Sequence, residues 1–303
     1  VTSLVNAASA SNSSCDPSQL AKASGTVNIT FEESMPGGAF SGFKGNRDFL
    51  AALIAAYNAS QHKVHVTDVN DAGGYTDTWT KYTADLSTGS FPDVVMFDQY
   101  DTQAAADTQS IVPISTCLAA DKSFNTKSFI PKALAAYTIG TTQYGMPFSV
   151  STPVMYYNKI AFKAAGIVNP PTTMAQLMAD QALLQKAHWS FNGKSGTYNY
   201  GVALKKDPWI TMTWLGMNDM PFVNNGNGHT SRTTGVAFNN ATAQAYWSDI
   251  QQMVKNGALA SGTTGTITQA YANLFAVANN QAGITFDTTA CLLYTSDAAD
   301  EGL

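Results

Sequence analysis

Hydrophobic and polar positions alternate along the first hundred residues with two periods, one typical of strands and one typical of helices. Residues 27–31, 64–69 and 93–97 are predicted strands, because their apolar residues alternate or form a short continuous run. Residues 46–58 and 76–86 are predicted helices, because their apolar residues recur about one turn apart. In the first of these helices, one face carries Phe49, Leu50, Leu53, Ile54 and Tyr57. This β-α-β-α-β order predicts an open α/β sheet with right-handed connections.

Three polar segments directly follow these predicted strands. They are residues 32–35, 71–75 and 98–100, which carry carboxyl, hydroxyl, amide and phenol groups. Ligands of open α/β sheets bind beyond the carboxyl ends of the strands. Aromatic rings suit the C–H faces of a small ligand, while hydroxyls and amides fix its orientation. The pattern therefore favours a small, polar and weakly charged ligand.

A second α/β unit is predicted after residue 148. Residues 153–157 form a predicted strand, and the helix over 159–165 ends at Gly166, the residue type favoured just past a helix. A further helix begins at Thr173, after the stiff pair Pro170-Pro171. Additional helices are predicted over 208–217 and 241–255, and a late strand over 282–286.

Length and composition narrow the class of protein. The chain has 303 residues, which at roughly 150 residues per domain predicts two domains or lobes. Charged residues make up 12%, about half the usual share, and the net charge is −5. A nucleic-acid-binding protein would show clustered Lys and Arg, and a membrane-spanning helix would need about 18 consecutive apolar residues. The sequence shows neither pattern, and its aromatic content of 11% argues against disorder.

Motifs for metal, phosphate or nucleophilic chemistry are missing from the sequence. Its four histidines form no zinc-binding pair, and it contains neither a Gly-x-Ser-x-Gly elbow nor a phosphate-binding loop. Residues 68–73 resemble the start of a calcium loop, but Trp79 stands where a bidentate Glu is required. We therefore expect no metal, no cofactor and no enzymatic activity.

The two ends of the chain and its cysteines give information on where in or outside the cell the protein is found. Ala8-Ser9-Ala10 fits the end of a cleaved signal peptide, which favours export. In an exported protein Cys15 and Cys117 are expected to pair, and lipidation of Cys15 is the less favoured alternative. Residues 291–303 show no periodicity and resemble a spurious tail read past the end of a genomic fragment, so we leave them out of the functional interpretation.

A long segment over residues 144–159, followed by 161–166 and 170–173, closely resembles the crossover segment of the family 1 extracellular solute-binding proteins of ABC importers. Within that group it is most similar to the glycerol-3-phosphate-binding branch, which neighbours the maltose-binding proteins. The resemblance covers about residues 25–290. Weaker matches in the same order lie at 26–35, 74–79, 89–95, 220–228 and 281–289.

The resemblance implies a type II periplasmic-binding-protein-like fold of two α/β lobes joined by a hinge and incomplete at the C-terminus. It places hinge residues at Ser149, Pro153 and Thr285. The implied organisation is a mostly flexible exported segment (1–24), lobe one (25–150), lobe two (151–283), a second hinge returning to lobe one (284–290) and the tail (291–303).

The resemblance also implies five ligand-binding residues. Tyr75 matches a lobe-one tyrosine at the ligand, and Ser151 matches a hinge serine. Gln99 stands where the glycerol-phosphate branch has Glu, Asp287 where it has Ser, and Trp209 lies near a lobe-two tryptophan. A carboxylate repels phosphate in a partly desolvated site, so Asp287 counts against glycerol 3-phosphate and favours a neutral sugar or polyol.

The predicted function is that of an exported, monomeric solute receptor that is extracellular, at the cell surface or periplasmic, and a lipid anchor stays open as an alternative. It would deliver a sugar, polyol or polyol phosphate to the transmembrane subunits of an ABC permease. Two alternatives stay open. A secreted carbohydrate-active enzyme would need two nearby carboxylates, for which Glu32 or Glu33 with Asp287 is the candidate pair. A surface adhesin would show no response to a small ligand.

Overall fold

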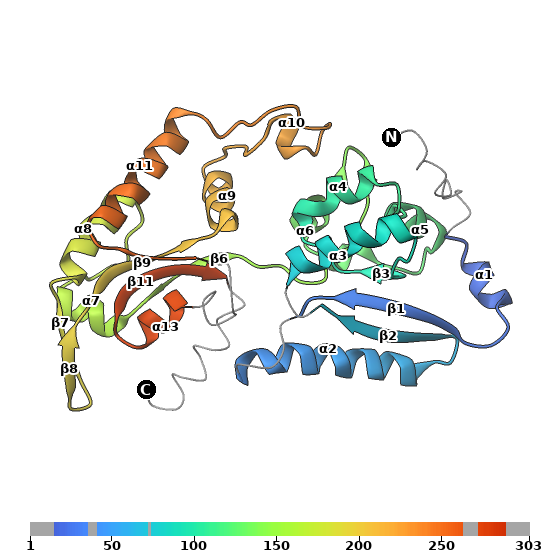
Figure 1. Cartoon of the computed structure of the whole chain (residues 1–303), viewed down its shortest axis with the longest axis horizontal. Helices are drawn as coiled ribbons and strands as arrows, with labels where there is room; N and C mark the ends of the chain where they lie inside the picture. Colours follow the sequence, from blue (N-terminus) through green and yellow to red (C-terminus); the bar gives the residue numbers. More distant parts are fainter. Residues whose placement is uncertain (1–14, 36–40, 72–73, 263–271, 289–303) are drawn as a thin grey trace. The chain divides into compact units, whose positions relative to one another are not determined.

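The chain divides into two units in the computed structural model, which describes residues 15–35, 41–71, 74–262 and 272–288 (Figure 1). Unit 1 comprises Val1–Val150 together with the short segment Gly228–Arg232, and unit 2 comprises Ser151–Asn227 and Thr233–Leu303. Sequence analysis assigned residues 228–232 to lobe two. They group with unit 1 because His229 and Gly140 share a hydrogen bond of 2.6 Å between their backbones, and Arg232 pairs with Asp107 at 2.5 Å.

Unit 1 is built on a three-stranded parallel sheet in the order β2-β1-β3. Its strands are β1 (Val27–Glu33), β2 (Val64–Asn70) and the two-residue β3 (Val94–Val95). Helices α2 (Ser41–Ser60) and α3 (Tyr75–Thr88) lie on opposite faces of the sheet (Figure 1). The β-α-β-α-β order predicted from the periodicity is confirmed, although β3 is shorter than predicted.

Several short elements complete unit 1. They are α1 (Pro17–Lys22), η1 (Gln99–Asp101), α4 (Thr102–Asp107), α5 (Ile114–Ala120), η2 (Thr126–Ser128), α6 (Pro131–Ala136) and the hairpin of β4 (Thr138–Ile139) and β5 (Thr142–Gln143). The N-terminal segment is thus helical over Pro17–Lys22, while residues 1–14 lie outside the described residues.

The apolar face predicted for α2 is only partly buried. Leu50 is 1% exposed, but Phe49, Leu53 and Tyr57 are 65%, 47% and 45% exposed. The spacing identified the helix correctly, but the expectation of a single apolar face was wrong as a guide to burial. Helix α2 packs chiefly against β2, so the described strands cover only a narrow stripe of the helix.

Unit 2 is built on a four-stranded sheet in the order β10-β9-β11-β6. Strands β9 (Tyr200–Lys206), β10 (Leu259–Gly262) and β11 (Ala282–Thr288) are parallel, and β6 (Pro153–Tyr157) runs antiparallel to β11. Its helices are α7 (Lys159–Ala165), α8 (Met174–Leu184), α9 (Pro208–Met217), α10 (Asn224–Asn227), α11 (Ala241–Lys255) and α13 (Ala272–Ala278). A hairpin of β7 (His188–Phe191) and β8 (Lys194–Thr197) follows α8.

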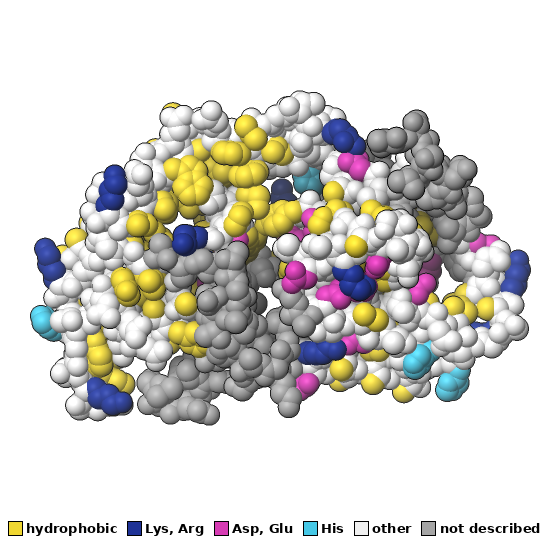
Figure 2. Space-filling model, in the orientation of Figure 1, with side chains coloured by type: hydrophobic (Ala, Val, Ile, Leu, Met, Phe, Trp, Pro, Cys, Tyr) yellow, Lys and Arg dark blue, Asp and Glu magenta, His cyan; other side chains and the backbone are white. Residues whose placement is uncertain are grey.

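The main core of unit 2 lies between the sheet and helices α7, α8 and α11. It contains Phe162, Leu184, Val202, Met253 and Ile284, each at most 4% exposed. Helix α8 crosses the sheet so closely that a Cβ on Gly201 would lie 2.2 Å from the carbonyl oxygen of Gln181. Charged side chains are sparse over the visible face (Figure 2), in keeping with the low charged fraction.

Candidate ligand-binding site

The strands of unit 1 end side by side, and a buried carboxylate lies at that edge. Glu33, the last residue of β1, is paired with Asn70 at the end of β2. Arg47 of α2 donates to Glu33 Oε1 over 2.8 Å and approaches Asp68 at 3.3 Å, and Asn70 Nδ2 donates to the same Glu33 oxygen over 2.6 Å. Glu33, whose side chain is completely buried, therefore ties both strands to α2.

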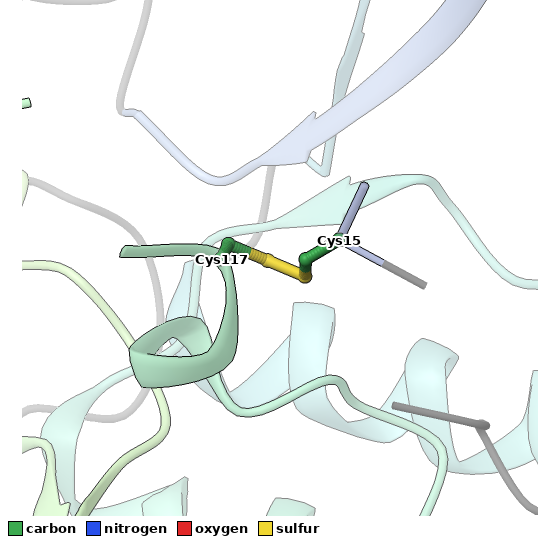
Figure 3. Close-up of a disulfide and its surroundings, with 2 residues drawn as sticks. All are labelled: Cys15 and Cys117. Carbon is green, nitrogen blue, oxygen red and sulfur yellow. A yellow bond between two sulfur atoms is a disulfide. The ribbon is translucent and has the colours of Figure 1, made fainter. Parts of the chain in front are cut away.

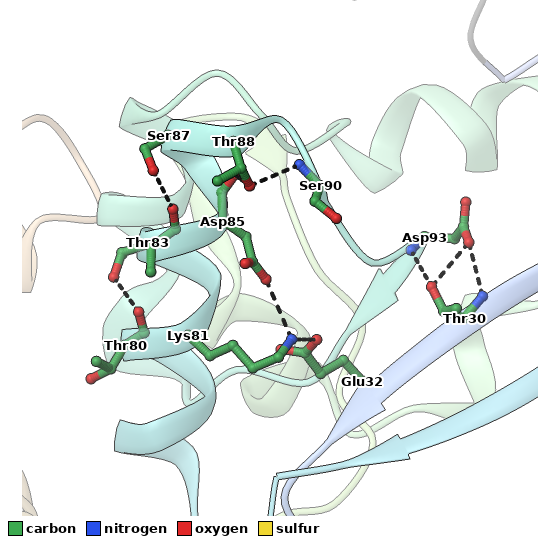
Figure 4. A network of polar contacts seen from close by, with 11 residues as sticks. Thr30, Glu32, Thr80, Lys81, Thr83, Asp85, Ser87, Thr88, Ser90 and Asp93 are labelled. Atoms are coloured by element: carbon green, nitrogen blue, oxygen red, sulfur yellow. Dashed lines mark hydrogen bonds and ion pairs between the residues drawn. The ribbon is translucent and has the colours of Figure 1, made fainter.

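Glu32 has a different partner, the ammonium group of Lys81 on α3 (Figure 4). Lys81 also lies 3.3 Å from Asp85, one turn further along the helix. Burial raises the pKa of Glu32, Lys81 opposes that rise, and the neighbouring Asp71 carboxyl adds to it. Glu32 Oε1 is buried and accepts no hydrogen bond from the part of the chain that the structure describes.

Tyr75 is the most exposed of the predicted lobe-one site residues. It is the first residue of α3, directly after Gly74, whose φ of 104° is a backbone conformation that favours glycine. The Tyr75 side chain is hydrogen-bonded to that of Ser149, and the residue is 40% exposed. Burial raises the pKa of the Tyr75 phenol, and the nearby Asp98 carboxylate raises it further.

Asp98 links this tyrosine to a second tyrosine and a second carboxyl group. Burial raises the pKa of Tyr137, and Asp98 adds to the shift. Burial likewise raises the pKa of Asp101 to about 6, with Asp98 again contributing. The predicted residue Gln99 is half-buried at the start of η1. The carboxylate that helps to raise the pKa of Tyr75 belongs to its neighbour, Asp98. We call Tyr75, Asp98, Asp101 and Tyr137 the unit 1 half-site.

The other predicted residues meet at one edge of the unit 2 sheet. Because β6 is antiparallel to β11, its first residue Pro153 pairs with Thr288, directly after Asp287. Ser151 is exposed and lies two residues before β6. Trp209 is half-buried in the first turn of α9, which follows β9. The edge where β9 and β11 end therefore carries Ser151, Trp209 and Asp287, and we call this edge the unit 2 half-site.

Asp287 is not open to solvent in this edge. Its side chain is completely buried, and Oδ1 accepts hydrogen bonds from Lys205 Nζ over 2.9 Å and from the Thr288 backbone over 2.8 Å. Lys205 is itself only 10% exposed and lies 3.9 Å from Asp207, the residue that caps α9 through the Trp209 backbone N–H. The sequence argument treated Asp287 as a lone carboxylate that repels anions. The structure shows that the buried ammonium group of Lys205 balances the charge of Asp287.

The predicted hinge residues occupy two kinds of position. Ser149 and Pro153 lie on either side of the boundary between Val150 and Ser151. Thr285 is completely buried inside β11, where its hydroxyl donates to the Ala203 carbonyl of β9 over 2.9 Å. Strand β11 belongs to the unit 2 sheet, and residues 289 and 290 of the predicted second hinge lie outside the described residues.

Cys15 and Cys117, the two cysteines expected to pair, form a disulfide (Figure 3). Their Cα atoms lie 4.8 Å apart, and the bond closes a separation of 102 residues within unit 1. Over the described residues, no three His, Cys, Asp or Glu side chains are placed to hold a metal ion. Within that same part of the chain, no helix is long and apolar enough to cross a membrane.

Sequence reasoning missed three charged residues of these edges, Arg47, Lys81 and Lys205, and it placed Asp98 in a strand-end segment without giving it a role. For Asp98 and Lys205 a signal was present, because each lies at or just past the end of a short apolar run, where strand-end residues gather. Arg47 and Lys81 come from helices, and only the packing of α2 and α3 on the sheet brings them to the glutamates.

Comparison with known proteins places these half-sites in context. The bacterial extracellular solute-binding protein family matches residues 52–300, a range that runs into the tail left out above. The sn-glycerol-3-phosphate-binding periplasmic protein UgpB of Escherichia coli (strain K12) is 29% identical over 191 residues, which are 61% of this chain and 42% of that protein. The chain thus spans less than half the length of this curated relative.

Two solved structures share the fold. The GacH receptor of Streptomyces glaucescens GLA.O superposes with a TM-score of 0.66 at 18% identity, over 88% of this chain and 61% of the receptor. UgpB from Mycobacterium tuberculosis, in complex with glycerophosphocholine, gives 0.63 at 18% identity over 88% and 60%. The family match covers most of the chain, from the middle of α2 to beyond β11. This chain belongs to the family of bacterial extracellular solute-binding proteins.

Proposed function

We propose that the protein is the substrate-binding component of an ABC importer, which captures a sugar, polyol or polyol phosphate and hands it to a permease. The observation that supports this most is the position of the predicted site residues. In each unit they lie at the edge where the strands end, the place where open α/β sheets bind ligands.

The chemistry of the half-sites favours a ligand with many hydroxyl groups. Tyr75 and Tyr137 offer aromatic faces, and Asp98 offers an acceptor for hydroxyl hydrogens. Arg47, Lys81 and Lys205 are each paired with a carboxylate. A neutral ligand would leave these ion pairs intact, whereas a phosphate would compete for them.

Export agrees with the disulfide, because such bonds persist in oxidising compartments outside the cytoplasm. The family relatives are solute-binding proteins rather than enzymes. In the enzyme alternative, Glu32 or Glu33 would work with Asp287. Each of these carboxylates is buried and bound to a cation of its own unit, so none resembles a free acid or base.

Isothermal titration calorimetry of the full-length gene product against neutral sugars, polyols and their phosphate esters tests the proposal. We expect one ligand per monomer, and at least tenfold weaker binding in Tyr75→Ala, because the ring packs on the ligand. Tyr57→Ala removes an equally exposed tyrosine from α2 and serves as the matched control. Turnover of a glycoside, or no binding of any member of the panel, would contradict the proposal.

A further inference from the structure

Lys205 and Asp287 are cross-strand neighbours at the carboxyl ends of two parallel strands. Thr285 of β11 pairs with Ala203 of β9, and the next residues on the same face are Asp287 and Lys205. Their side chains are 0% and 10% exposed, and Nζ lies 2.9 Å from Oδ1. The pair is therefore built into the sheet, and its geometry does not depend on a mobile surface side chain.

Two carboxylates lie beside the ammonium group of Lys205. Lys205 contributes one positive charge, and Asp287 and Asp207 contribute one negative charge each. The start of α9, which has ten residues, adds the partial positive charge of a helix N-terminus, which the Asp207 cap partly satisfies. Asp287 Oδ2 is buried and accepts no hydrogen bond from the described residues.

We propose that Lys205 decides whether the unit 2 half-site accepts a neutral or an anionic ligand, and that Asp287 is the positioning residue that keeps Lys205 neutralised. This inference rests on the proposed function and names the ligand class of the same site. Asp287 acts through Lys205, since its own side chain has no exposed surface. A phosphate group would have to displace a carboxylate that is already bonded to the lysine and to a backbone N–H.

The physical reason is the cost of a buried charge. An ion with little exposed surface is costly unless a counter-charge lies beside it. With Asp287 present, that counter-charge belongs to the protein, so a hydroxyl-bearing ligand meets a neutral pair. With Asp287 replaced by the isosteric asparagine, the ammonium lacks its nearest anion, and a ligand phosphate can supply the missing charge.

The test uses matched pairs of ligands that differ by one phosphate, such as glycerol and glycerol 3-phosphate, glucose and glucose 1-phosphate, and mannitol and mannitol 1-phosphate. The measured quantity is the ratio of dissociation constants, phosphate ester over neutral partner, at low salt. In Asp287→Asn we expect this ratio to fall at least tenfold. Adding Lys205→Met to that variant is expected to restore the wild-type ratio, because the ammonium that has lost Asp287 is then removed as well.

Two further variants supply a second test of the unit 2 charges and a control in unit 1. Asp207→Asn keeps a good helix cap but removes the weaker charge at 3.9 Å, so the ratio is expected to fall about threefold even if Asp287→Asn does not fold. Asp107→Asn, the control, likewise removes one negative charge, but from unit 1, and we expect it to leave the ratio of dissociation constants unchanged.

An unchanged ratio in folded Asp287→Asn and Asp207→Asn would overturn the inference while leaving the proposed function intact. A gain in phosphate binding that persists without Lys205 would also overturn it. A wild-type protein that binds no ligand of the panel would instead contradict the proposed function, and the inference with it.

Discussion

The two units differ in how exposed the cations are that neutralise their buried carboxylates. In unit 1, Glu33 and Glu32 are buried, but the cations that meet them are the half-exposed side chains of Arg47 and Lys81, which are 35% and 44% exposed. In unit 2, Asp287 and its partner Lys205 are both buried. Solvent screens the half-exposed cations of unit 1, whereas it has little access to either member of the pair in unit 2. The same kind of ion pair should therefore contribute differently to the free energy of unfolding in the two units.

The largest effect is expected from breaking the unit 2 pair on one side. Asp287→Ala removes the nearest counter-charge of the buried Lys205 ammonium, and we expect unit 2 to lose about 3–5 kcal/mol of stability. Urea unfolding followed by hydrogen exchange resolved for each unit measures it. The double variant Asp287→Leu, Lys205→Met should recover most of the loss. A loss as small as that of a surface ion pair would show that water reaches the site.

The disulfide sets the next largest effect, and it is confined to unit 1. Cys15→Ser with Cys117→Ser removes a link across 102 residues, and we expect about 3 kcal/mol of destabilisation, the usual size for the loss of a disulfide. The melting temperature of unit 1 should fall in the same way when the wild type is reduced with dithiothreitol. Reduction of the serine variant is the control and should have no effect. A loss spread equally over unit 2 would contradict this assignment.

A smaller effect is expected from the cations of unit 1. Arg47→Met leaves Glu33 with its Asn70 hydrogen bond, and Lys81→Met leaves Glu32 beside Asp71. We expect each to cost about 1–2 kcal/mol, less than Asp287→Ala, because solvent already screens the half-exposed cation of each pair. Urea midpoints of the two variants and of Asp287→Ala, compared side by side, measure the difference. Equal losses in both units would break the comparison drawn above.

The smallest effect comes from Asp101, whose pKa is about 6 in the folded protein. A carboxyl whose pKa is raised on folding binds protons more tightly in the folded state. Its ionisation therefore removes stability as the pH rises from about 4 to about 6. Asp101→Asn should stabilise unit 1 by about 1 kcal/mol at pH 7, after allowance for solvent screening, and by nothing near pH 3. Urea titrations of variant and wild type at both values test it, and stabilisation that is independent of pH would contradict it.

Much of the fold was readable from local pattern. The two periods of hydrophobic residues placed the strands and helices of the first β-α-β-α-β unit, and Gly166 marked the end of α7, where its φ is 72°. The β7–β8 hairpin was missed, although Asn192-Gly193 between two strand-like runs is a strong turn signal, and both residues have positive φ. The hairpin was predictable from the sequence, because its turn signal lies in two neighbouring residues.

The sequence by itself determined the order of elements, the edges where strands end, the cysteines available for pairing and the family resemblance. Only the tertiary structure decided which charges meet, that most of the apolar face of α2 stays exposed, and that Asp98 acts on Tyr75. It also decided that Asp287 is held by Lys205, which is 82 residues away in the chain. The reason is physical. Turns and periodicity depend on neighbouring residues, whereas burial and ion pairing depend on which distant segments exclude water from the same place.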